Sequence, residues 1–134
     1  MIDGYPVLGK CEDLPGLGEI WAVCAIGFGR TRKKIIHQVE RYKNVMFATL
    51  VDPKAEVGRT CKVFEGSIIC ANSVLISNVN IGSHTIINLD CTIGHDSSIR
   101  DFVTVYPSVN IFGNCFVGSC SELGTGIHIM QGKR

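Results

Sequence analysis

Aliphatic residues recur at every sixth position from residue 57 to residue 129. The same slot holds Val, Ile or Leu in thirteen consecutive sextets, namely Val57, Val63, Ile69, Leu75, Ile81, Ile87, Ile93, Ile99, Val105, Ile111, Val117, Leu123 and Ile129. Because about a quarter of the residues in an average protein are aliphatic, chance does not produce such a run. A helix cannot hold a period of six, and a hairpin array alternates with a period of two.

This period predicts a parallel β-helix in which three sextets form one triangular coil. We expect the aliphatic residue to fill the interior and the fourth residue after it, mostly small or β-branched, to fit the corner. Cys61, Cys91 and Cys115 occupy that fourth slot, so they are predicted to be packing residues. One coil cannot bury its apolar face alone, but a stack of coils spaced by about 4.8 Å can.

Residues 1–52 have a different pattern, which predicts a partial Rossmann-like α/β domain. An apolar strand over 20–26, an amphipathic helix over 30–42 and a second strand over 45–51 form a βαβ unit. The chain is thus expected to divide into residues 1–52 and a mainly β domain of residues 53–134. Gly27 and Gly29 before the basic helix leave open a phosphate site at its N-terminus, although the G-x-G-x-x-G motif is incomplete.

Composition narrows the function classes. A net charge of +1 favours neither nucleic acid nor an acidic membrane surface as a partner. No apolar run is long enough to cross a bilayer, and the N-terminus lacks the pattern of a signal peptide. The seven cysteines form no C-x-x-C pair, which favours free thiols in the cytoplasm over disulfides or a zinc site.

Several segments resemble the hexapeptide-repeat acyltransferases, which have a left-handed β-helix. Within that family the chain is most similar to sugar acetyltransferases of the sialic acid O-acetyltransferase and bacillosamine N-acetyltransferase type. The similar segments are residues 4–9, 25–27, 32–34, 51–53, 86–96 (IINLDCTIGHD) and 108–118. The resemblance implies transfer of an acetyl group from acetyl-CoA to a hydroxyl or amine of a sugar or nucleotide-sugar.

The chemistry requires a base for the attacking hydroxyl or amine and a donor for the oxyanion of the tetrahedral intermediate. His95 is the candidate base, because it follows a glycine at an expected corner and a neutral imidazole accepts a proton near pH 7. The resemblance implies that Asp96 orients His95 and that Asn88 binds the acceptor. Gly113 lies one coil of eighteen residues after His95, so it should stack on His95, and the resemblance makes its N–H the oxyanion donor.

The resemblance also implies a homotrimer in which a neighbouring subunit completes each site and CoA lies between two β-helices. Relative to the family, the chain lacks an N-terminal strand with a glycine-rich nucleotide-sugar loop and further C-terminal coils, so we expect a shortened protein. Thr104, nine residues after His95, replaces a family histidine that contacts substrate or acetyl-CoA. The acceptor, and the choice between O- and N-acetylation, stay open.

Two other functions remain alternatives. A non-catalytic trimeric scaffold or binding module would fit the missing segments. A metal enzyme of the γ-carbonic anhydrase type needs three converging histidines, but only His84 and His95 lie in the central coils, and eleven residues between them do not make a whole coil. We therefore expect no metal, and we expect His37, His84 and His128 to be surface residues.

Overall fold

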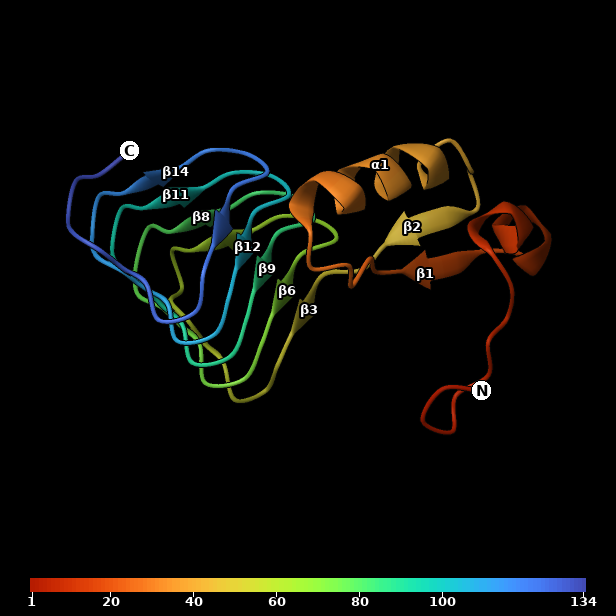
Figure 1. The fold of residues 1–134 in the computed structure, drawn as a ribbon, viewed down its shortest axis with the longest axis horizontal. Coiled ribbons are helices and arrows are strands. Elements are labelled where there is room, and N and C mark those ends of the chain that lie inside the picture. The colour runs from red at the N-terminus through yellow and green to blue at the C-terminus, as the bar shows by residue number, and fades with distance from the viewer.

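In the computed structural model, which describes residues 1–134, the chain forms a parallel β-solenoid of about four coils with a small α/β unit beside it (Figure 1). The solenoid confirms the mainly β fold that the six-residue period predicts. The α/β unit lies at one side of the solenoid and leads to the N-terminus, whereas the C-terminus ends the last coil (Figure 1).

The α/β unit contains the 3-10 helix η1 (Cys11–Leu17), β1 (Ile20–Ala22), α1 (Gly29–Val39) and β2 (Val45–Phe47). Strands β1 and β2 are parallel, with Ile20 opposite Val45, so the expected strand–helix–strand order is confirmed. Two strands and one helix make a βαβ unit but do not by themselves define a Rossmann fold.

The single strand expected over 45–51 is wrong, because the structure divides it between two sheets. The backbone N–H of Ala48 still bonds the Ala22 carbonyl, at 2.9 Å, as a continuation of the β1–β2 pair. Two residues later the N–H of Leu50 bonds the Ser67 carbonyl, also at 2.9 Å, and β3 (Leu50–Val51) pairs with a solenoid strand. The solenoid sheet therefore begins before residue 53.

Every strand of the solenoid is two residues long. The remaining strands are β4 (Glu56–Val57), β5 (Lys62–Val63), β6 (Ile68–Ile69), β7 (Val74–Leu75), β8 (Asn80–Ile81), β9 (Ile86–Ile87), β10 (Thr92–Ile93), β11 (Ser98–Ile99), β12 (Thr104–Val105), β13 (Asn110–Ile111), β14 (Phe116–Val117), β15 (Glu122–Leu123) and β16 (His128–Ile129). They form three parallel sheets, in the orders β16-β13-β10-β7-β4, β14-β11-β8-β5 and β15-β12-β9-β6-β3.

The predicted register is confirmed throughout. Each of the thirteen aliphatic residues is the second residue of a strand, and Ile93 pairs with Leu75 below it and Ile111 above it. These side chains fill the interior, where a cluster of fourteen buried hydrophobic residues runs along the solenoid. The partner of each register residue is thus eighteen positions away, which stacks like residues from coil to coil.

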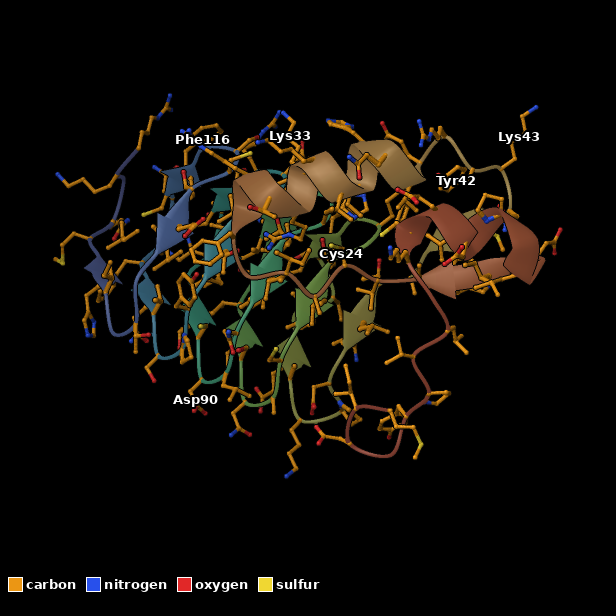
Figure 2. The ribbon with its side chains drawn as sticks, turned by 45° about the vertical axis from the view of Figure 1, so that its right-hand side comes forward. Cys24, Lys33, Tyr42, Lys43, Asp90 and Phe116 are labelled. Atoms are coloured by element: carbon orange, nitrogen blue, oxygen red, sulfur yellow. The ribbon has the colours of Figure 1, made fainter.

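The corners depend on the third residue after each register position, which has a positive φ at every corner after the first, where Thr60 follows Val57. The residues in this left-handed conformation are Gly66, Asn72, Asn78, His84, Asp90, Asp96, Phe102, Ser108, Asn114, Cys120, Gly126 and Gly132. Asp90 marks one of these corners in Figure 2. Asn, Asp and Gly adopt this conformation at the lowest cost, which explains their frequency in the slot.

The fourth slot points inward and carries more than packing. The Ser97 hydroxyl donates to the Phe112 carbonyl at 3.2 Å and accepts the Cys115 N–H at 3.1 Å. Ser67, Ser73 and Thr85 repeat this pattern on their own coils. Cys91 and Cys115 are buried in the core cluster and Cys61 packs against it, so their predicted packing role is confirmed.

Arg32 of α1 anchors the α/β unit to the solenoid. Its side chain is fully buried, with an exposed fraction of 0%. Its Nε donates to the His84 carbonyl at 2.7 Å and its Nη2 to the Val103 carbonyl at 2.9 Å, while Nη1 donates to the carbonyls of Ile26 and Gly27. One buried guanidinium therefore joins the helix to two corners of the solenoid.

The same junction contradicts the phosphate-site hypothesis. The N–H of Gly29, at the first residue of α1, donates to a Glu122 carboxylate oxygen at 3.2 Å. A carboxylate at a helix N-terminus already satisfies the positive end of the dipole and repels another anion. Arg32, one of the basic residues of this helix, is directed into the solenoid and not toward such a ligand.

Candidate active site

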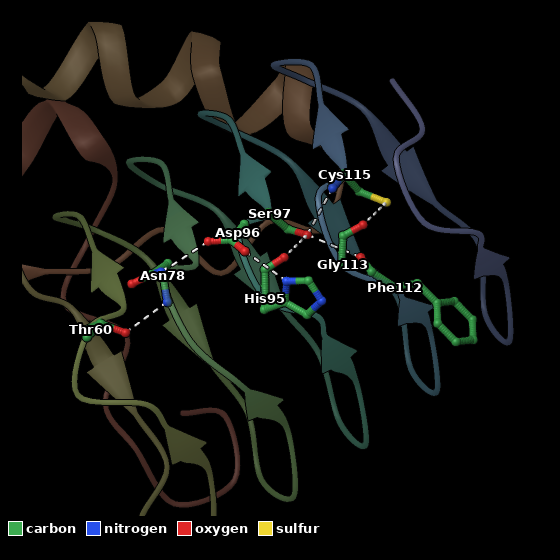
Figure 3. Close-up of polar contacts among 8 residues, drawn as sticks. All are labelled: Thr60, Asn78, His95, Asp96, Ser97, Phe112, Gly113 and Cys115. Carbon is green, nitrogen blue, oxygen red and sulfur yellow. Dashed lines mark hydrogen bonds and ion pairs between the residues drawn. The ribbon is translucent and has the colours of Figure 1, made fainter.

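His95 and Asp96 form a hydrogen-bonded pair at the corner between β10 and β11. The Nδ1 atom of His95 lies 2.8 Å from Oδ2 of Asp96. Both side chains are about half exposed, at 51% and 54%, so the pair is accessible from outside the solenoid. With Nδ1 bonded to the carboxylate, Nε2 is the ring nitrogen left without a hydrogen-bond partner (Figure 3).

The Asp96 carboxylate is held in place by two different donors. Its Oδ2 faces His95, and its Oδ1 accepts a hydrogen bond from Asn78 Nδ2 at 3.1 Å. Both bonds lower the pKa of the Asp96 carboxyl from its ordinary value of 3.8, and the bond with His95 has the larger effect. Asp96 is therefore ionised near neutral pH, which favours the tautomer of His95 with its proton on Nδ1 and its lone pair on Nε2.

Gly113 stacks on His95, as the coil spacing predicts. A Cβ atom built on Gly113 would lie 2.4 Å from Nε2 of His95, so the ring fills the space that a side chain would take. The Gly113 N–H has no hydrogen-bond acceptor within the chain. A residue with a free backbone donor therefore lies beside the candidate base (Figure 3), and such a donor is what an oxyanion site requires.

Asn88 lies at a different corner of the coil. It follows β9, whereas His95 follows β10, so one whole strand separates them along the chain. The Asn88 side-chain oxygen accepts the N–H of Leu89 at 3.0 Å, and the residue is half-buried. A single chain does not bring Asn88 and His95 together.

Thr104, the predicted replacement for a substrate-contacting histidine, is buried under the α/β unit. Its exposed fraction is 1%. The hydroxyl accepts a hydrogen bond from Arg32 Nη2 at 3.0 Å and donates to the Gly27 carbonyl. A substrate contact by Thr104 is not available in this arrangement, because both roles of its hydroxyl serve the junction with the α/β unit.

His84 is not a surface residue, contrary to the expectation. Its exposed fraction is 5%, and its ring stacks on Phe102 at 5.3 Å and meets the edge of Phe47 at 4.8 Å. Its Nδ1 atom is buried without a hydrogen-bond partner, and burial lowers the pKa of the imidazole from its ordinary value of 6.5. His37 and His128 are exposed, as expected.

The sequence interpretation missed Asn78, although a signal for it exists. Asn78 occupies the left-handed slot eighteen residues before Asp96, and Asn, Asp or Gly fill that slot in most coils. A period of Asn and Asp three residues after each aliphatic register residue would have placed Asn78 directly below Asp96 in the stack.

Other features of the structure concern metals, thiols and membranes. No group of three or more His, Cys, Asp or Glu side chains is arranged to hold a metal ion. All seven cysteines are free thiols. No helix has the length and apolar character needed to span a bilayer.

No protein-family model matches the chain, and a search of curated proteins found no match. Solved structures do match it. The acetyltransferase domain of PglB from Neisseria gonorrhoeae FA1090 superposes with a TM-score of 0.88 and 27% identity, over 97% of this chain and 64% of that one. The same domain in complex with acetyl coenzyme A gives a TM-score of 0.89 and 26% identity, over 98% and 65%.

A more distant match is PerB from Caulobacter crescentus, in complex with CoA and GDP-perosamine. It has a TM-score of 0.71 and 19% identity, over 96% of this chain and 72% of PerB. This chain thus spans less than two thirds of the length of the PglB domain structures. The resemblance to β-solenoid acetyltransferases, predicted from the hexapeptide pattern, is confirmed for the fold.

Proposed function

We propose that this chain is an acetyltransferase that moves an acetyl group from acetyl-CoA to a hydroxyl or amine of a sugar or nucleotide-sugar. One observation carries the proposal: Gly113, whose backbone N–H has no acceptor in the chain, stacks against Nε2 of a His95 whose Nδ1 is held by Asp96. The match to an acetyltransferase domain solved with acetyl coenzyme A supports it.

The geometry suits attack on a thioester. Nε2 of His95 accepts the proton of the acceptor hydroxyl or amine while that oxygen or nitrogen bonds to the acetyl carbonyl carbon. The resulting oxyanion accepts a hydrogen bond from the Gly113 N–H. When the intermediate collapses, the C–S bond breaks and the imidazolium returns its proton to the departing CoA thiolate. Asp96 stabilises the imidazolium between these two transfers.

Assembly is the second part of the proposal. If Asn88 contacts the acceptor, it has to come from a neighbouring copy, because Asn88 and His95 lie at different corners of one coil. Exposed apolar side chains accompany both corners: Phe112 is 48% exposed near His95, and Leu89 is 46% exposed next to Asn88. We propose a homotrimer in which such corners meet and CoA binds in the groove between two solenoids.

Further parts of the proposal follow the resemblance. The solenoid is left-handed, the βαβ unit is a partial Rossmann-like element, and the two parts act as domains that meet between Ala48 and Leu50. The protein works in the cytoplasm with its thiols reduced. An acceptor bearing a nucleotide is supported by the acetyltransferase-like fold shared with PerB, which was solved with GDP-perosamine. Thr104 has no substrate-binding role in the proposal, since its hydroxyl serves the junction with α1.

The test combines binding and turnover. Calorimetry should show saturable binding of acetyl-CoA, and release of CoA thiol should depend on an amino-sugar or hydroxy-sugar acceptor from a panel of nucleotide-linked and free sugars. His95→Ala should reduce kcat by about 100-fold or more, since a positioned base contributes roughly 10²–10⁴-fold.

The control is His128→Ala, which removes an exposed histidine from the last coil. Full activity of His95→Ala would disprove the mechanism, and a well-folded trimer without acetyl-CoA binding would favour the scaffold alternative.

A further inference from the structure

Asn78 contacts the oxygen of Asp96 that His95 leaves free. Its Nδ2 lies 3.1 Å from Oδ1 of Asp96, while Nδ1 of His95 lies 2.8 Å from Oδ2. The two oxygens of one carboxylate thus have separate partners, one from the coil below and one from the neighbouring residue (Figure 3). A carboxylate bonded through both oxygens has a defined plane as well as a defined position.

Asn78 is itself tied to the coil below it. Its backbone N–H donates to the Thr60 hydroxyl at 2.9 Å, and its left-handed φ of 53° places it in the same corner slot as Asp96. The backbone N–H of Asp96 donates to the Ser77 carbonyl at 3.0 Å, which fixes the spacing of the two corners. A chain of contacts therefore runs from Thr60 through Asn78 and Asp96 to His95 across three coils.

The neighbouring corner repeats the Asn–Asp bond without a histidine. Asn72 Nδ2 donates to Asp90 Oδ1 at 3.0 Å, and both residues have left-handed φ angles, of 61° and 57°. The residue before Asp90 is Leu89, where His95 stands before Asp96. The Asn72–Asp90 bond can therefore affect only the stability of its corner, whereas the Asn78–Asp96 bond also connects to an imidazole.

The connection matters because the His95–Asp96 pair is half exposed. An exposed hydrogen bond between two mobile side chains contributes little by itself, since water competes for both groups. If the carboxylate rotated toward solvent, the imidazole would lose its partner at Nδ1 and its tautomer preference. Outer partners that orient such groups commonly affect function about 10- to 100-fold, as in metal sites where they orient histidine ligands.

We infer that Asn78 is a positioning residue of the proposed acetyl transfer: it holds the Asp96 carboxylate in the plane that keeps the His95 proton on Nδ1 and Nε2 open to the acceptor. This inference rests on the proposed function. It assigns Asn78 a role in the orientation of the base, not a contact with substrate.

The first experiment compares Asn78→Gly with Asn72→Gly. Glycine keeps the left-handed backbone of both corners without strain, so each variant loses the same Asn–Asp bond and little else. The 15N shifts of the His95 ring report its tautomer directly and require no turnover. We expect Asn78→Gly to lower the fraction with the proton on Nδ1 and to reduce kcat about ten-fold, with KM for acetyl-CoA nearly unchanged. Asn72→Gly should match the wild type in both measurements.

A charge variant gives a second readout. Asn78→Asp replaces the donor by a carboxylate of the same shape, so negative charge is added next to Asp96 and the imidazolium is favoured. The ascending limb of kcat against pH should therefore move to higher pH in Asn78→Asp and stay in place in Asn72→Asp. A residue that only stabilised the corner would change the melting temperature of both variants without moving the limb.

The outcomes separate this inference from the proposed function. An active wild type in which Asn78→Gly and Asn72→Gly share the wild-type tautomer and kcat would overturn the positioning role and leave the function intact. If the wild type shows no turnover, the proposed function fails, and the tautomer comparison still decides whether Asn78 orients the imidazole. Thermal unfolding of each variant shows whether the coil stack is intact.

Discussion

Gly113 lies against the imidazole of His95, one coil above it, so closely that a Cβ on Gly113 would be 2.4 Å from Nε2. This contact exists because successive coils place residues eighteen positions apart on top of each other. The neighbour of Gly113 supports the same stacking, since the N–H of Asn114 donates to the His95 carbonyl at 2.7 Å. The absence of a side chain at residue 113 is thus what gives the His95 ring its place.

Gly113→Ala should impair catalysis far more than folding. The added methyl group meets the outer end of a flexible, half-exposed side chain, and Gly113 does not have a positive φ. We therefore expect the ring to swing aside with little change in melting temperature and kcat to fall about 100-fold, since a displacement of about 1 Å can cost that much. Steady-state kinetics and circular dichroism measure the two effects.

The matched control is Gly118→Ala. Its Cβ would have only the Ser121 hydroxyl oxygen within 4 Å, at 4.0 Å, so neither the fold nor the site should change. Wild-type kcat in a folded Gly113→Ala protein would contradict the assigned arrangement of Gly113 and the base.

Asp96→Asn should reduce kcat by roughly 10- to 100-fold, by analogy with outer partners of functional histidines. Asn tolerates the left-handed φ of 58° at this corner, so the backbone is expected to stay in place. The loss arises because a neutral amide cannot stabilise the imidazolium and can present its NH₂ group to Nδ1, which reverses the tautomer. Asp90→Asn is the control, as Asp90 has the same corner slot and an Asn partner but no histidine. Equal kcat in the two variants would refute the role of Asp96.

Arg32→Met should weaken the docking of the α/β unit by about 3 kcal/mol, because leaving buried groups without their hydrogen bonds costs about 1–3 kcal/mol each. The carbonyls of His84 and Val103 and the hydroxyl of Thr104 would lose a charged donor. Limited proteolysis should cut residues 1–48 at lower protease concentration, while the solenoid keeps its circular dichroism. Arg30→Met, an exposed position on the same helix, should leave the cleavage rate unchanged. A rate equal for both variants would show that Arg32 is not the anchor.

Stability should fall as the pH drops below about 6.5, because of His84. Burial is the largest cause, and it lowers the pKa of His84 in the folded protein below its ordinary value of 6.5. The positive charge of Arg32 also lowers this pKa, whereas the negative charges of Glu65, Glu40 and Asp101 raise it. The unfolded chain then binds a proton that the folded chain does not, so stability is full above 6.5 and is lost as the pH falls toward the lowered pKa. Each unit of lowering corresponds to about 1.4 kcal/mol.

The measurement is the unfolding midpoint between pH 7.5 and pH 5, in the wild type and in His84→Asn. Asn does not ionise and accepts the left-handed φ of 53°, so its midpoint should depend less on pH. His128→Asn, at an exposed histidine, should keep the wild-type dependence. An unchanged pH dependence in His84→Asn would assign the effect to another group.

Local interpretation of the sequence failed where two segments pack against each other. The strand expected over 45–51 reads as one apolar run, yet Ala48 pairs with β1 and Leu50 with the solenoid. His84 has no motif around it, and its burial also depends on Phe47 of β2, which lies outside the repeat. Arg32 is charged and lies on an amphipathic helix, so nothing near it in the sequence indicates that five hydrogen bonds enclose it.

The six-residue period by itself determined the solenoid, the strand register and the stacking of Gly113 on His95, because a regular coil turns sequence distance into spatial distance. The tertiary structure alone decided the side-chain hydrogen bond from Asn78 to the Asp96 carboxylate, the burial of Thr104 and His84, and the entry of Arg32 into the solenoid. Those features depend on the directions of side chains at the corners and on where the α/β unit docks, and neither follows from a periodicity along the chain.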